Sequence, residues 1–229
     1  MFGNNPARKQ ELDPRGQLWV QELFHTLQGE GPFACESALF VRLAGCNLRC
    51  FWCDTEFESS SWRPALDELL AALERERPPS CELVVITGGE PFRQQIGPLV
   101  EALLARGLRV QIETAGSLWV ELPEDPRLTV VCSPKTPRLN PELERRISAY
   151  KYVLAAGELG EDGLPVSSTQ VRGSLARLAR PRAGVPVFVM PRDDRDPEQN
   201  QRHLEACVDV AKRHGYRLTL QLHKLVGLP

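Results

Sequence analysis

The run Leu83-Val84-Val85-Ile86 is the feature that most limits how this chain can fold, because four apolar residues lead directly into a Thr-Gly-Gly turn. A short apolar run without alternation is typical of a strand covered on both faces, as strands of parallel sheets are. Strand-like and helix-like stretches alternate on either side of this run. Parallel strands joined by right-handed helical crossovers produce such alternation. The sequence therefore predicts an α/β fold.

The remaining elements support this fold class. Further strands are expected at residues 18–24, 38–43, 108–112, 128–132, 150–154, 187–190 and 217–222. Apolar periodicity predicts helices over residues 64–76, 96–104 and 197–214, with a weaker helical pattern over residues 169–179. About six parallel strands with three or four helices fall short of the eightfold barrel. We therefore expect an incomplete, partial TIM-like barrel with fewer helices than a full barrel.

The length of 229 residues suits one domain. Residues 1–16 are rich in charge and turn formers and are expected to be a flexible leader, so that residues 17–229 form the single domain. The formal net charge is −2 and basic residues are dispersed, which gives no indication of nucleic-acid or anionic-membrane binding. No apolar run approaches the ~20 residues of a spanning helix. Seven unevenly spaced cysteines favour a reducing compartment, and a cytoplasmic location is expected.

Three cysteines, Cys46, Cys50 and Cys53, stand at C-x3-C-x2-C spacing just after an expected strand. Closely spaced thiolates are the ligands of iron–sulfur clusters. A four-iron cluster has four corners, so three protein ligands leave one iron free to bind a small molecule. A structural zinc site would need a fourth ligand, and nothing in the sequence selects His25 for that role. An open cluster is favoured over zinc.

Other polar segments also follow expected strands. They are the Gly88-Gly89-Glu90 turn, Glu113, and Ser133-Pro134-Lys135. The carboxyl ends of parallel strands are where chemistry gathers in such sheets. Adjacent glycines allow the backbone to approach a ligand closely, although the same turn could be an ordinary strand-to-helix connection. The position of these segments predicts that they share one site with the cysteine loop.

The cysteine motif, with Trp52 before the third cysteine and the Gly-Gly-Glu turn after the next strand, resembles the radical S-adenosylmethionine superfamily. A narrower resemblance, to the 7-carboxy-7-deazaguanine synthase family, is carried by residues 24–31, 40–45, 53–55 and 221–224. It extends over the chain beyond the leader. The family is a group of ring-contracting lyases of queuosine and deazapurine biosynthesis. They convert 6-carboxy-5,6,7,8-tetrahydropterin to 7-carboxy-7-deazaguanine with loss of ammonia.

The resemblance implies a cofactor set and a set of contacts. Cys46, Cys50 and Cys53 would hold a 4Fe-4S cluster, and Thr55 would bind Mg2+. Contacts to S-adenosyl-L-methionine would come from Gly88, Gly89, Glu90, Glu113, Ser133, Pro134 and Lys135. Substrate contacts would come from Leu27, Gln28, Gly29, Glu30, Arg42, Thr87, His223 and Pro229. No catalytic side chain is expected beyond the radical of the cluster-bound cofactor.

Two of these contacts have ordinary alternatives. The Arg42 guanidinium matches a substrate carboxylate, but it could instead form a surface salt bridge. Thr55 could be a capping residue. The family further implies a homodimer and a reducing electron donor, such as a flavodoxin-like protein. An alternative function is a glycyl-radical activating enzyme that acts on a partner protein. It would share the cluster but would not need residues 28–31 or Arg42.

Overall fold

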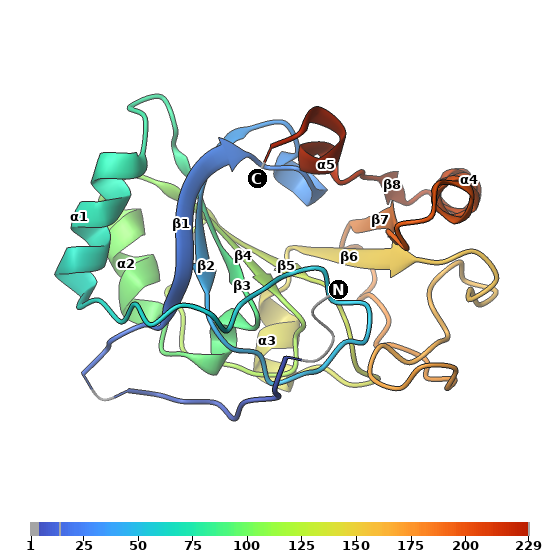
Figure 1. The fold of residues 1–229 in the computed structure, drawn as a ribbon, viewed down its shortest axis with the longest axis horizontal. Helices are drawn as coiled ribbons and strands as arrows, with labels where there is room; N and C mark the ends of the chain where they lie inside the picture. The colour runs from blue at the N-terminus through green and yellow to red at the C-terminus, as the bar shows by residue number, and fades with distance from the viewer. Residues whose placement is uncertain (1–4, 14, 229) are drawn as a thin grey trace.

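The computed structural model describes residues 5–13 and 15–228. Its centre is one sheet of eight strands in the order β1 to β8, drawn in Figure 1. The strands are β1 (Val20–Leu27), β2 (Ser37–Leu43), β3 (Leu83–Gly88), β4 (Arg109–Thr114), β5 (Leu128–Cys132), β6 (Ala149–Leu154), β7 (Val187–Pro191) and β8 (Arg217–Leu218). β1 pairs antiparallel with β2, and strands β2 to β8 run parallel. β1 and β8 are the two edges, so the sheet is not closed and the expected partial barrel is confirmed.

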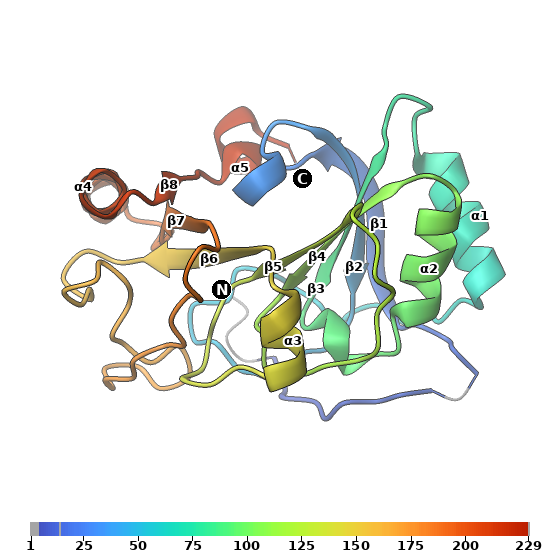
Figure 2. The same ribbon diagram turned by 180° about the vertical axis from the view of Figure 1, so that it is seen from behind.

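Within the described residues, five α-helices and two 3-10 turns connect or follow the strands. They are α1 (Leu66–Glu76), α2 (Gly97–Ala105), α3 (Pro141–Arg146), α4 (Pro197–His214), α5 (Leu222–Val226), η1 (Gly31–Phe33) and η2 (Pro91–Arg93). Helices α1 and α2 lie beside the first strands, and α4 lies beside β7 and β8 (Figures 1 and 2). The short helix α5 lies between the ends of β1 and β8. Among the described residues, none of the helices has both the length and the apolar character needed to cross a bilayer.

The packing of the core explains why sequence patterns predicted β3 and α4. The side chains of Leu83, Val84, Val85 and Ile86 are all fully buried, as expected for a strand covered on both faces. Helix α4 begins after Asp196, whose carboxylate accepts hydrogen bonds from two N–H groups of the first turn, and it ends before Gly215 in the left-handed conformation (φ 69°). Asp196 is a preferred N-cap residue and Gly215 a preferred residue after a helix, so the sequence marks both ends of α4.

Three expectations about elements need correction. Residues 169–179 form turns rather than a helix, because Gly173 adopts φ 74° and the apolar side chains of Val171 and Leu175 have no core to face. The last strand stops at Leu218 instead of residue 222. Helix α1 begins two residues after Pro64, where the Glu68 carboxylate accepts a hydrogen bond from the Ala65 N–H.

The expected leader makes ordered contacts in its described part. The Arg8 N–H donates to the Cys46 carbonyl at 2.7 Å, and the Glu11 N–H donates to the Arg93 carbonyl at 2.7 Å. The Arg8 guanidinium also pairs with the Glu58 carboxylate. These residues lie across the base of the cysteine loop. That the leader is flexible stays a prediction.

Candidate active site

A cleft of about 610 Å³ opens where the strands end. Its wall includes Thr87 and Gly88 at the end of β3, Glu113 near the end of β4 and Pro191 at the end of β7. The predicted site residues that line it are Leu27, Gln28, Gly29, Glu30, Arg42, Cys46, Cys50, Cys53, Thr55, Thr87, Gly88, Gly89, Glu113, Ser133, Lys135 and His223. The fold therefore gathers segments far apart in the sequence around one space.

Three predicted residues are not in this wall. Pro134 lines a small neighbouring cavity of about 20 Å³ rather than the cleft. Glu90 is fully buried beneath the Gly-Gly turn. Pro229 lies outside the described residues. The expected cofactor contacts of Pro134 and Glu90 stay predictions.

The cysteine loop leaves β2 at Leu43 and turns its three thiols toward the cleft. The Leu48 N–H lies 3.4 Å from Cys46 Sγ, and the Gln170 amide donates to Cys50 Sγ at 3.2 Å. Burial raises the pKa of the Cys46 thiol to about 12, and it also raises the pKa of Cys53. These thiols become good ligands only when a cationic centre stabilises the thiolates. N–H donors around the sulfurs suit a cluster, whose properties such hydrogen bonds tune.

The alternative of a single zinc ion is not supported by the geometry. Among residues 5–13 and 15–228, no three His, Cys, Asp or Glu side chains gather closely enough to hold one metal ion. His25 instead shares a hydrogen bond of 2.8 Å with the Ser37 hydroxyl. A four-iron cluster places each thiolate on a different iron, so its ligands stand farther apart than those of one ion. Cys46, Cys50 and Cys53 all line the same cleft, as the ligands of such a cluster would.

The Gly88-Gly89 turn is pressed against the cysteine loop. A Cβ on Gly88 (φ 142°) would lie 2.1 Å from the Leu43 carbonyl oxygen, and a Cβ on Gly89 would lie 2.2 Å from the Gly45 carbonyl oxygen. The Gly89 and Glu90 N–H groups already donate to the carbonyls of Leu43 and Gly45. Gly88 and Gly89 still line the cleft, and their contact with the cofactor stays a prediction. Glycine is required here for close packing.

Glu90 secures the turn from below. Its carboxylate accepts hydrogen bonds from the Thr114 hydroxyl at 2.7 Å, the Ala115 N–H at 2.8 Å and the Phe92 N–H at 3.1 Å. Burial raises the pKa of this carboxyl despite those donors. Glu90 thus ties the turn after β3 to the end of β4.

Gly89→Ala is expected to lower the free energy of unfolding by about 2 kcal/mol and to reduce the iron held after reconstitution. The added methyl must displace Gly45 or the Cys46 side chain, since a Cβ there would meet Cys46 Cβ at 2.9 Å. Thermal melting and iron analysis measure the two effects. Gly107→Ala is the control for iron content: its φ of 81° strains any side chain, but no atom lies within 4 Å of the added Cβ, so this variant should lose stability and keep its iron. Full iron content in Gly89→Ala would contradict the packing argument.

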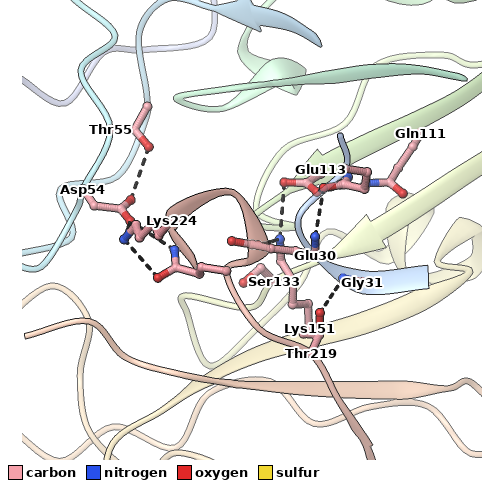
Figure 3. A network of polar contacts seen from close by, with 12 residues as sticks. Glu30, Gly31, Asp54, Thr55, Gln111, Glu113, Ser133, Lys151, Thr219 and Lys224 are labelled. Atoms are coloured by element: carbon pink, nitrogen blue, oxygen red, sulfur yellow. Dashed lines mark hydrogen bonds and ion pairs between the residues drawn. The ribbon is translucent and has the colours of Figure 1, made fainter. Parts of the chain in front are cut away.

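The floor of the cleft holds a lysine that the motifs did not reveal. Lys151 Nζ on β6 lies 2.5 Å from Glu30 Oε2 and 3.3 Å from Glu113 Oε2 (Figure 3). Burial alone would lower the pKa of this ammonium, but the two carboxylates outweigh burial and raise the pKa. One signal could have found it: a single cation stands inside the otherwise apolar strand Ala149–Leu154.

The C-terminal tail closes one side of the cleft. Lys224 Nζ lies 3.0 Å from both Asp54 Oδ2 and Asp193 Oδ2, and the contact with Asp54 is visible in Figure 3. Burial opposes ionisation of Asp54, yet Lys224 outweighs it and lowers the pKa of that carboxyl. His223 lies against Gly29, where a Cβ would come within 2.5 Å of the ring Nδ1. The tail therefore holds His223 over the turn that follows β1.

Another lysine stands near the cysteine loop. Lys135 Nζ donates to the Ser133 hydroxyl at 2.5 Å and lies 5.5 Å from the centre of the Trp52 ring. Burial lowers the pKa of this ammonium. Its position beside the loop fits a contact with an anionic group at the cluster end of the cleft.

Comparison with known proteins gives the same family from sequence and fold. The radical SAM superfamily model matches residues 41–150. The 7-carboxy-7-deazaguanine synthase of Rhodospirillum rubrum is 58% identical over the full length of both chains, and that of Rickettsia prowazekii is 37% identical over all of this chain and 96% of its own.

A solved structure described as QueE from Escherichia coli has a TM-score of 0.67. It covers 90% of this chain and 95% of its own at 24% identity, which supports the fold. The relatives support the synthase rather than a glycyl-radical activating enzyme. The chain belongs to the 7-carboxy-7-deazaguanine synthase family of the radical SAM superfamily.

Proposed function

We propose that this cleft converts 6-carboxy-5,6,7,8-tetrahydropterin to 7-carboxy-7-deazaguanine with release of ammonia. One observation carries the assignment to this site: the three thiols, the turn at residues 28–30 and Arg42 line a single cleft. The family requires a 4Fe-4S cluster and S-adenosyl-L-methionine. When bound, this pair supplies the electron and the 5′-deoxyadenosyl radical that begin the reaction.

The protein's own groups divide the cleft into two ends. Near the cysteine loop, Gly89, Ser133 and Lys135 would hold the cofactor, and Glu113 would accept hydrogen bonds from its ribose hydroxyls. At the other end, Gln28, Glu30 and His223 would hold the flat pterin ring. Arg42 and Thr87 are register partners on β2 and β3, and both line the space between the two ends. This arrangement would place the substrate carboxylate beside the cofactor.

Anaerobic incubation with a reductant, S-adenosyl-L-methionine and the carboxypterin tests the proposal. The expected products are 7-carboxy-7-deazaguanine and ammonia, with the cofactor regenerated. Release of 5′-deoxyadenosine without any deazaguanine would contradict the substrate assignment while leaving the cluster assignment intact. A colourless protein without iron after anaerobic reconstitution would contradict both.

We further propose that Thr55 contributes a hydroxyl ligand to Mg2+, an ion that keeps several waters and takes few protein ligands. The Thr55 hydroxyl bonds to Asp54 Oδ1 at 3.3 Å and the residue lines the cleft. Thr55→Ala is expected to raise the half-saturating Mg2+ concentration on the order of tenfold, as measured by titrating activity against the metal. Thr55→Ser keeps the hydroxyl and should restore the affinity. An unchanged titration in Thr55→Ala would refute this role.

We also propose an oligomeric state, an electron donor and a cellular location. A homodimer is supported by the exposed apolar side chains of Leu225 (67% exposed) and Val226 (57% exposed) on α5, and light scattering would measure it. A flavodoxin-like protein would deliver the electron. The seven free cysteines and the need for thiolate ligands support a reducing cytoplasmic location.

A further inference from the structure

Lys151 joins three separate parts of the site. It projects from β6, while Glu30 stands just before η1 and Glu113 is on β4. The lysine side chain is 7% exposed, and the two carboxylate side chains are 14% and 19% exposed. A charge taken out of water this far is costly unless it is paired. The geometry therefore places one shared ammonium between two largely dehydrated carboxylates.

We propose that Lys151 is a positioning residue that pairs with Glu30 and Glu113 and holds both side chains in place, so that one buried ammonium couples the substrate end of the cleft to the cofactor end. The names of the two ligands rest on the proposed function. The pairing itself rests on the distances in Figure 3. Lys151 acts through the two carboxylates and takes no part in bond breaking.

Neutral amides complete the arrangement. Gln28 Nε2 donates to Glu113 Oε1 at 3.1 Å, and Gln111 Nε2 donates to the same oxygen at 2.9 Å. The Gln28 carbonyl oxygen accepts the Glu30 N–H at 3.1 Å. Each Glu113 oxygen thus has its own donor, and Lys151 supplies the only cation that the described residues bring within hydrogen-bond distance of either carboxylate. Without it, only uncharged donors remain.

The charges also predict what the floor attracts. Two carboxylates and one ammonium leave an excess of negative charge facing the cleft. This excess favours ligand groups that donate hydrogen bonds, such as the amino and ring N–H groups of a pterin and the hydroxyls of a ribose. Lys151 reduces this excess by placing one positive charge between the two side chains. Loss of the lysine should therefore weaken binding at both ends.

The pH dependence separates this role from simple packing. Burial raises the pKa of Glu30, but Lys151 outweighs burial, so that the pKa lies below the ordinary value of 4.5. Two nearby groups have smaller effects: His223 lowers the pKa of Glu30, and Asp54 raises it. Lys135 is a further cation near Lys151, and burial together with the repulsion between the two ammonium groups lowers the pKa of Lys135. In the wild-type protein the lowered pKa adds stability that is present above pH ~4.5 and is lost only as the pH falls through the lowered value. When Lys151 is removed, burial dominates and the pKa of Glu30 rises above its unfolded value. Stability is then lost as the pH increases.

Lys151→Met and Lys151→Arg test the pairing in reconstituted holoenzyme. Melting temperatures between pH 5 and 8 should fall with rising pH in Lys151→Met relative to wild type, and Lys151→Arg should follow the wild-type profile. The triple variant Lys151→Met, Glu30→Gln, Glu113→Gln removes all three charges and should flatten the profile again, which keeps the test valid if the single variant folds poorly. Lys212→Met on the exposed face of α4 is the control for loss of a lysine. A Lys151→Met profile parallel to wild type would overturn the proposal.

Steady-state kinetics tests the coupling. Lys151→Met should raise KM for the carboxypterin and for S-adenosyl-L-methionine at least tenfold at pH 6.5, with the pterin effect shrinking as pH rises and Glu30 ionises. A purely structural role would lower stability and leave both KM values and their pH dependence unchanged, and that result would refute positioning. If the wild-type protein makes no deazaguanine, the proposed function fails, whereas the melting profiles still decide whether Lys151 pairs with both carboxylates.

Discussion

Cys50→Ala is expected to abolish stable cluster binding, so that iron per chain falls to background after anaerobic reconstitution. Cys50 is one of three thiols around the cleft, and two thiolates would leave two corners of a four-iron cluster without protein ligands. The expected spectroscopic result is loss of the charge-transfer absorption and of the reduced-cluster EPR signal. Activity should disappear with the cluster.

The surroundings of Cys50 explain why other groups cannot replace it. The Gln170 amide that contacts Cys50 Sγ at 3.2 Å would point at a methyl group instead. Cys46 is buried, and burial raises the pKa of its thiol to about 12, so metal binding must overcome protonation at the sites that remain. Loss of Cys50 should therefore reduce the affinity of the cysteine loop for the cluster by more than a one-third share of the binding free energy.

Cys35→Ala is the matched control for Cys50→Ala. Cys35 is exposed and does not line the cleft, so its removal should leave the iron content unchanged. Full iron stoichiometry in Cys50→Ala, or equal loss in both variants, would show that the cysteine loop does not hold the cluster.

The positions of the strands could be predicted from sequence where local and tertiary signals agree. β3 is a continuous apolar run because both of its faces are covered, and α4 has a cap at Asp196 and a stop at Gly215. The residues just after the strands were expected to share a site because carboxyl ends of parallel strands meet. That inference depends on topology rather than on side-chain detail, and most of these residues do line one cleft.

The rest depended on contacts that no local pattern encodes. Thr219 donates its N–H to the Val189 carbonyl, and its hydroxyl accepts the Gly31 N–H, so the chain leaving β8 is held against the turn that follows β1. Glu90 follows two glycines as in a ligand-binding turn, yet its carboxylate is used inside the protein. In the sequence, Lys151 is simply the one charged residue of the buried strand β6. Its two partners are 121 and 38 residues away in sequence.

Arg42→Ala is expected to raise KM for the carboxypterin ~100-fold, equivalent to about 2.7 kcal/mol of lost binding. Arg42 on β2 lines the cleft, with its guanidinium 5.5 Å from the centre of the Phe24 ring. Its Nε lies 2.5 Å from Glu22 Oε1 on the antiparallel neighbour β1. The surface salt bridge considered from sequence is therefore present, but it occupies one edge of a guanidinium that carries five donors.

The balance between Glu22 and a substrate carboxylate decides what Arg42 does. The Glu22 side chain is 51% exposed, and a pair with such a partner contributes only about 0–1 kcal/mol. A substrate carboxylate in the cleft would meet the planar fork in bidentate geometry, which is roughly twice as strong as a neutral hydrogen bond. The substrate should therefore win. Glu22 would then orient Arg42 rather than compete for it.

Two further variants make this test specific. Glu22→Gln removes the surface pair and should change KM by less than about threefold, because a surface pair contributes so little. Arg42→Lys keeps the charge without the fork and should lie between wild type and Arg42→Ala. Release of 5′-deoxyadenosine without substrate should persist in Arg42→Ala, since Arg42 is assigned to the substrate and not to the cofactor. The contradicting result is an unchanged KM in Arg42→Ala together with a loss of melting temperature equal to that of Glu22→Gln. The surface pair would then be the whole role of Arg42, and the substrate carboxylate would have to bind elsewhere in the cleft.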